Sequence, residues 1–115
     1  MKTAQQIFDK TLHHLRKQGV AAIDENGKCS YRTESGASCA VGCHIPDAKY
    51  SPSLEGKRAN ASKVLEATGF IGQGHGVLLN HLQACHDAHL KGQGLEAWET
   101  VMQDVALQHG LTYKP

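Results

Sequence analysis

The sequence predicts a single, mainly helical α+β domain over residues 1–115, with about four helices and a short β-hairpin or strand-turn-helix insert near residues 28–45. This length is typical of one domain with its own hydrophobic core. Apolar residues recur at three- and four-residue intervals along most of the chain, which favours helices, but turn residues interrupt this period between 24 and 47. We expect the core to be formed by the helices over 3–18, 77–90 and 95–109.

The first predicted helix covers residues 3–18. Thr3 is its candidate N-cap, and Gly19 follows two basic residues at the expected end. The apolar face of this helix is formed by Ala4, Ile7, Phe8, Leu12 and Leu15.

Two interpretations of the insert remain open. Residues 28–32 and 38–41 could be the strands of a hairpin around Glu34-Ser-Gly36. Alternatively, Cys39-Ala-Val-Gly-Cys43 begins a short helix that ends before Pro46, with only the first of these segments extended.

Three further helices are predicted in the second half of the chain. A short helix over 60–68 has Asn60 or Ser62 as its candidate N-cap, and longer periodic stretches follow over 77–90 and 95–109. Each is followed by a glycine, a residue common just past helix ends: Gly69, Gly92 and Gly110.

Charge and hydropathy set limits on the partners. The chain has 12 Lys and Arg against 11 Asp and Glu, a formal net charge of +1. Its overall charge is therefore too small to attract a polyanion such as a nucleic acid. A nucleic-acid partner has weak support and would depend on local groups such as Lys57 and Arg58, because aromatic residues make up only 5% of the chain. The absence of an export signal or membrane span predicts a cytoplasmic protein with reduced thiols and no membrane partner.

The cysteines and histidines suggest a small zinc-stabilised module as one alternative function. Cys39 and Cys43 form one closely spaced pair, and His81 and Cys85 form another that shares a helix face. His89 extends the same helix face and Cys29 could replace any of these ligands, so the ligand set stays open. The competing interpretation is that the cysteines are small buried apolar residues and that the protein has no cofactor.

A thiol- or metal-dependent hydrolase is the second alternative. Cys39 or Cys43 could be a nucleophile if a histidine and an acidic residue such as Asp47 lie within hydrogen-bond reach. The adjacent Cys43 and His44 do not meet this condition through sequence proximity alone. The glycine-rich stretch 69–76 could contact a phosphate, but it lacks the complete motif of a nucleotide-binding loop.

A protein-binding role is the leading hypothesis. Tyrosine and arginine are favoured at the centres of protein interfaces, and charged residues flank them here. Arg32 could instead pair with Asp47 or Glu55 as a support inside the fold. The candidate partner-binding residues are Tyr31, Arg32, Glu34, Tyr50 and Lys57.

The middle of the chain also resembles a known family. The resemblance covers about 28 residues and is carried by Cys29-x-Tyr31-Arg32, Gly36, Cys39-Ala-Val-Gly42, Ile45-Pro-Asp47, Tyr50 and Glu55-Gly56. This pattern resembles a family of small uncharacterised proteins encoded by bacteriophages and prophages, from which the chain departs at Cys43 and His44. The resemblance implies an accessory protein that binds a host protein inside a bacterial cell, for example as an inhibitor of a defence or regulatory complex, and it transfers no active residue.

Overall fold

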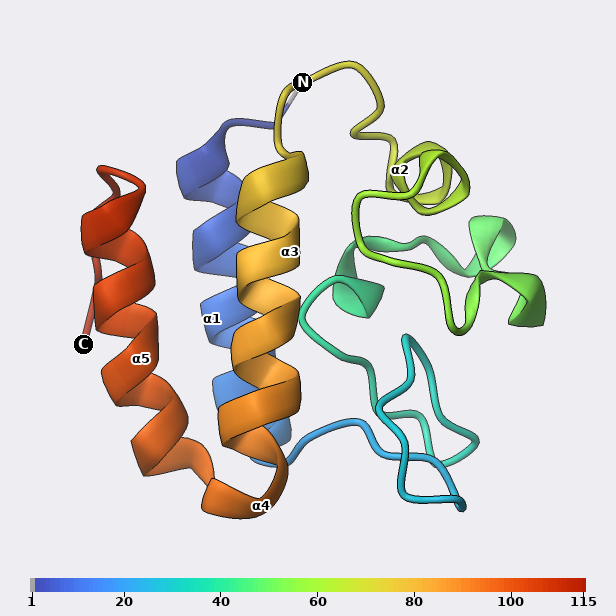
Figure 1. Ribbon diagram of the computed structural model, residues 1–115, viewed down its shortest axis with the longest axis horizontal. Helices are drawn as coiled ribbons and strands as arrows, with labels where there is room; N and C mark the ends of the chain where they lie inside the picture. The colour runs from blue at the N-terminus through green and yellow to red at the C-terminus, as the bar shows by residue number, and fades with distance from the viewer. Residues whose placement is uncertain (1) are drawn as a thin grey trace.

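The computed structural model describes residues 2–115, which form helices joined by turns and loops (Figure 1). A π-helical segment, His86–Leu90, continues α3 into α4. Three short 3-10 turns cover Gly42–His44, Asp47–Lys49 and Pro52–Leu54. The α-helices are α1 Ala4–Gln18, α2 Ser62–Thr68, α3 Gly76–Cys85, α4 Lys91–Gln93 and α5 Leu95–Gln108.

The molecule has a helical half and an irregular half. Figure 1 shows α3 in front of α1 with α5 alongside, while α2 and the turns of the middle segment lie on the other side of α3. α3 contacts both α1 and α5, as expected for the predicted core helices. The largest fully buried side chains come mainly from these three helices and include Phe8, Leu15, Leu79, Leu82, Trp98 and Met102.

The bounds of α1 confirm the prediction from its capping residues. The Thr3 hydroxyl accepts from the Gln6 N–H, and the Gln6 side chain accepts from the Thr3 N–H, which completes a capping box. At the other end, Gly19 adopts the left-handed conformation with φ 77° and donates to the Leu15 carbonyl.

The later helices agree with the predicted positions but differ in detail. The stretch predicted as one helix over 77–90 changes from α- to π-helix at His86, a change that the apolar period did not indicate. The predicted N-cap of α2 is wrong: Ala61 holds that position without a side-chain cap. None of the helices in residues 2–115 is both long and apolar enough to cross a membrane.

The α+β fold class is wrong, because residues 2–115 contain no β-strand. The segment near 28–45 has only two isolated antiparallel bridges, Ile23 to Cys29 and Arg32 to Ser38, each closing a tight turn. Asp24 and Thr33 stabilise these two turns by accepting backbone N–H groups through their side chains.

The hairpin does not extend because its backbone donors bind a side chain instead of a neighbouring strand. The N–H groups of Tyr31 and Arg32 donate to the two carboxylate oxygens of Glu55, at 2.9 and 3.2 Å. After Ser38 the chain bends into the 3-10 turn Gly42–His44, which removes the second strand. Glu55 lies far along the chain, so the local pattern of the insert could not show this competition.

Candidate functional site

A cleft with several polar groups, called the main cleft below, lies between the two halves of the molecule. It has a volume of about 520 Å³ and is bounded by residues 29–31, residues 55–59 and the cleft-facing side of α3. Its polar lining residues include Cys29, Glu55, Lys57, Arg58, Asn80, Gln83 and Asp87.

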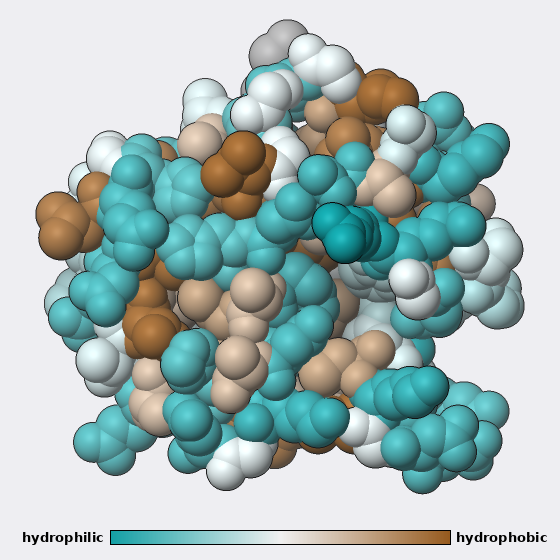
Figure 2. All heavy atoms as spheres, viewed as in Figure 1, coloured by the Kyte–Doolittle hydropathy of each residue, from teal (hydrophilic) through white to brown (hydrophobic). Residues whose placement is uncertain are grey.

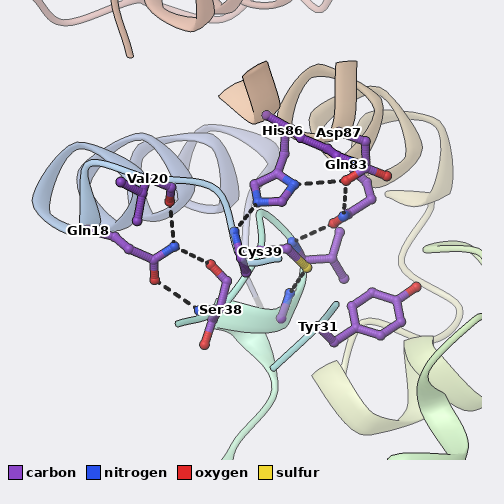
Figure 3. A network of polar contacts seen from close by, with 12 residues as sticks. Gln18, Val20, Tyr31, Ser38, Cys39, Gln83, His86 and Asp87 are labelled. Carbon is purple, nitrogen blue, oxygen red and sulfur yellow. Dashed lines mark hydrogen bonds and ion pairs between the residues drawn. The ribbon is translucent and has the colours of Figure 1, made fainter. Parts of the chain in front are cut away.

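One edge of this cleft holds a cluster of three groups with metal-binding chemistry. The ligand atoms of Cys29, His86 and Asp87 all lie within 4.8 Å of one another. His86 Nδ1 is 2.8 Å from Asp87 Oδ1, and His86 Nε2 accepts from the Ala22 N–H at 3.0 Å (Figure 3). His86 is fully buried, whereas the side chain of Asp87 is 45% exposed.

The hydrogen bonds of His86 determine which nitrogen carries its proton. A backbone N–H can only donate, so Nε2 must accept from Ala22 and the proton must lie on Nδ1, where it donates to Asp87. A metal ion at Nδ1 would have to displace this proton and leave an imidazolate, or break a fully buried hydrogen bond. The three side chains therefore fit one another better than they fit a metal ion.

The thiols of this chain are poorly suited to nucleophilic attack. Burial, together with a hydrogen bond to Asp87, raises the pKa of Cys29 to about 11. Burial also raises the pKa of Cys39 and Cys43 to about 12 and that of Cys85 to about 11. A nucleophilic cysteine normally has a lowered pKa, so none of the four is activated.

Asp87 is held in its charged form and connects α3 to the irregular half. Burial opposes its charge, but hydrogen bonds from His86, Cys29 and Gln83 outweigh this effect and lower the pKa of Asp87. Gln83 donates to Asp87 at 3.0 Å and accepts from the Val41 N–H at 3.1 Å. Figure 3 shows this continuous series of hydrogen bonds from the Ala22 backbone to the Val41 backbone.

Glu55 is a second polar centre, formed by residues of the predicted partner-binding set. Besides the two backbone donors, its Oε2 accepts from the Tyr50 hydroxyl at 2.7 Å. Tyr31 is only 5% exposed, and its hydroxyl donates to the Lys57 carbonyl. Tyr31 and Tyr50 therefore support the chain around Glu55, and Tyr31 presents almost no surface to a partner.

Arg32 forms the predicted alternative pair with Asp47, at the surface of the fold rather than inside it. Its guanidinium lies 2.6 Å from the Asp47 carboxylate, donates to the Ile45 carbonyl and is stacked 5.0 Å above the Tyr50 ring. Of the predicted set, Glu34 and Lys57 are exposed, and only Lys57 and Tyr31 line the main cleft. The structure thus leaves one predicted residue, Lys57, both exposed and in the cleft.

The predicted zinc ligands are not brought together. Among residues 2–115, the only group of three or more possible ligands within 4.8 Å of one another is the cluster at Cys29. The Cys39 sulfur accepts from the Gly42 N–H, and the Cys43 thiol donates to the Ala40 carbonyl, each at 3.3 Å. The other two predicted ligands, His81 and Cys85, line a separate groove between α3 and α5.

The elements of the predicted hydrolase site are also separated. His44 is buried against Thr11, with 2.8 Å between Nε2 and Oγ1, while Asp47 is exposed and paired with Arg32. Burial, followed by the charges of nearby cations, lowers the pKa of His44 to about 3. The glycine-rich stretch lines a second hollow, of about 590 Å³, together with Lys2 and Lys10.

Sequence reasoning missed the residues that organise the cleft. The sequence suggests Glu55 as a possible partner of Arg32 and as part of the resemblance, but not as an acceptor for backbone N–H groups, and it assigns no role to His86. Gln83 and Asp87 carried no motif. The adjacent His86-Asp87 pair was the one available signal, although neighbouring positions on a regular helix do not face the same partner.

No family model, curated protein or solved structure matches this chain.

Proposed function

We propose that this protein is a non-catalytic accessory factor of phage or prophage origin that binds a protein of the bacterial host, in the host cytoplasm. The observation that carries the proposal is the pair of cationic side chains at the main cleft. Lys57 and Arg58 are exposed and line the cleft, and neither forms an ion pair with any residue in 2–115.

The chemistry of the cleft supports binding rather than catalysis. A thiol hydrolase needs a low-pKa cysteine next to a free imidazole nitrogen. Here the pKa of Cys29 is raised to about 11, and both nitrogens of His86 are occupied by Ala22 and Asp87. The cleft therefore offers recognition groups without an activated nucleophile.

The partner segment that suits this cleft is acidic and polar. Glu55 and Asp87 line the same cleft, but their carboxylates already accept hydrogen bonds from Tyr31 and Arg32 and from Gln83 and His86. Lys57 and Arg58 have no such partner and favour carboxylates, and Asn80 on the opposite wall presents an amide without a hydrogen-bond partner among residues 2–115. On the face seen in Figure 2, hydrophobic residues form separate spots among hydrophilic ones. Charge complementarity at the cleft would thus contribute more to specificity than a large apolar contact would. An inhibitor of a host defence or regulatory complex would fit this mode of binding.

The test is site-specific capture of the partner. A photo-cross-linking residue in place of Asn80 should trap one bacterial protein from a lysate, and the purified pair should then bind in calorimetry. The double substitution Lys57→Glu, Arg58→Glu should weaken this binding about tenfold or more, because two attractive charges become repulsive.

Lys17→Glu is the matched control, since Lys17 is exposed on α1 and does not line the cleft. It should leave the affinity within about twofold. Equal affinity of the double variant and the control would remove the cleft as the binding site. Failure to trap any protein from lysates of several bacterial hosts would count against the binding role itself.

A further inference from the structure

The groove between α3 and α5 has a distinct chemistry. Its volume is about 280 Å³, and its lining residues include one carboxylate, that of Asp104, and no lysine or arginine. His81 and Cys85 line the groove from α3, while Asp104 lies on α5. The local charge is therefore favourable for a cation.

Two histidines meet at the edge of this groove. His81 Nδ1 lies 3.1 Å from Nε2 of His109, the residue that ends α5. Both rings are partly exposed, and neither His81 Nε2 nor His109 Nδ1 has a hydrogen-bond partner within residues 2–115. Each ring can therefore move its proton to the outer nitrogen and turn a free lone pair toward the other ring.

This freedom distinguishes the pair from His86. The tautomer of His86 is fixed by a buried backbone N–H, so its Nδ1 has no free lone pair. His81 and His109 are partly exposed and their outer nitrogens bind no other group among residues 2–115, so either tautomer can be hydrated. Without a metal ion His81 and His109 share one partly buried hydrogen bond, which a metal ion bound by both nitrogens would replace, whereas at His86 the bond to the Ala22 N–H is fully buried.

The separation of the two nitrogens matches a shared metal ion. Zinc binds histidine nitrogens at about 2.0–2.1 Å, so two nitrogens on one tetrahedral zinc ion lie roughly 3.3 Å apart. The observed distance between His81 Nδ1 and His109 Nε2 is close to this, at 3.1 Å. We propose that His81 Nδ1 and His109 Nε2 chelate a divalent transition-metal ion such as Zn²⁺, with water completing the coordination. The ion would join the middle of α3 to the end of α5.

The surroundings agree with this assignment. Partial burial, followed by the influence of His109, lowers the pKa of His81, which keeps its imidazole in the neutral form that binds metals. Cys85 and Asp104 line the same groove, but no three ligand atoms there lie within 4.8 Å of one another. The proposed ligand pair contains His81 from the predicted zinc set and His109 in place of the cysteines, and neither histidine lines the main cleft.

Zinc titration of the purified chain tests the site. Calorimetry in a chelator-free buffer should show one Zn²⁺ per chain, and about 1 mM ZnCl₂ should raise the melting temperature, because the ion binds only the folded state. His81→Gln and His109→Gln should each weaken zinc binding about tenfold or more and abolish the rise in melting temperature.

Two controls separate this site from its neighbours. His89→Gln changes another histidine of the same groove and should leave zinc affinity within about twofold. Cys85→Ser should also retain binding, since the proposed ligands are both nitrogens. The proposal is overturned if the wild-type chain binds no Zn²⁺ at that concentration, if His109→Gln binds as tightly as wild type, or if Cys85→Ser abolishes binding.

Discussion

Gly42 lies so close to the backbone of Tyr31 that no side chain fits between them. A Cβ atom at position 42 would lie 2.0 Å from the Tyr31 carbonyl oxygen. Cys39 holds the two backbone segments together: its N–H donates to the Tyr31 carbonyl, and its sulfur accepts from the Gly42 N–H. The glycine is thus required by close packing rather than by its own backbone angles.

Gly42→Ala should therefore destabilise the protein by about 3 kcal/mol, the upper part of the usual range for overpacking. Chemical denaturation of the two proteins measures this difference. Gly76→Ala is the control: its Cβ would approach only the Asn60 Cβ, at 3.3 Å, and the first turn of α3 favours alanine. A change below about 1 kcal/mol at both positions would show that the Tyr31 contact is not tight.

At the scale of elements, the π-helical segment His86–Leu90 decides how α3 meets the irregular half. One extra residue per turn alters which side chains face the cleft, and π segments often occur at such functional positions. Here the segment begins where His86 reaches the Ala22 N–H and Asp87 reaches Gln83. Gln83 also accepts from the Val41 N–H, so the loops at Ala22 and Val41 are both fixed to one helix.

His86→Leu should destabilise the fold by about 2–3 kcal/mol, because it leaves the buried Ala22 N–H without an acceptor. Hydrogen exchange should show the accompanying loss of protection at the Ala22 amide. His89→Leu, in the same segment but partly exposed, should change stability by no more than about 0.5 kcal/mol. Unchanged protection at Ala22 in His86→Leu would contradict the role assigned to this hydrogen bond.

At the scale of the whole molecule, a buried histidine makes the fold sensitive to mild acid. Burial lowers the pKa of His44 from 6.5 to about 3, so the unfolded chain takes up a proton below pH 6.5 that the folded chain refuses until about pH 3. The unfolded state binds more protons in this window. Stability is therefore greatest above pH 6.5 and falls as the pH falls.

Because of His44 alone, the free energy of unfolding should fall by about 2 kcal/mol between pH 7 and pH 5. Urea denaturation at the two pH values measures the loss in wild type and in His44→Gln, which cannot titrate and should lose about 2 kcal/mol less. His13→Gln, at an exposed position, should follow wild type. An equal acid dependence in His44→Gln and wild type would assign the loss to other groups.

Local signals in the sequence place the three long helices of the core. Thr3 and Gly19 bound α1, and the three- and four-residue apolar period places α3 and α5, because caps and amphipathic faces depend on residues close together in the chain. Turn residues also interrupt the helical period between 24 and 47, which includes the cysteine-rich segment from Cys29 to Asp47. These local signals were sufficient to predict a mainly helical core made of three long helices.

The form and the chemistry of that segment depend on contacts between residues far apart in the chain. Glu55 takes the backbone donors that a hairpin would have used, and His86 reaches Ala22 across 64 residues of chain. Such bonds join residues that no local period relates, so neither the missing strands nor the cleft could be read from spacing. The same holds for His81 and His109, whose approach depends on the packing of α3 against α5.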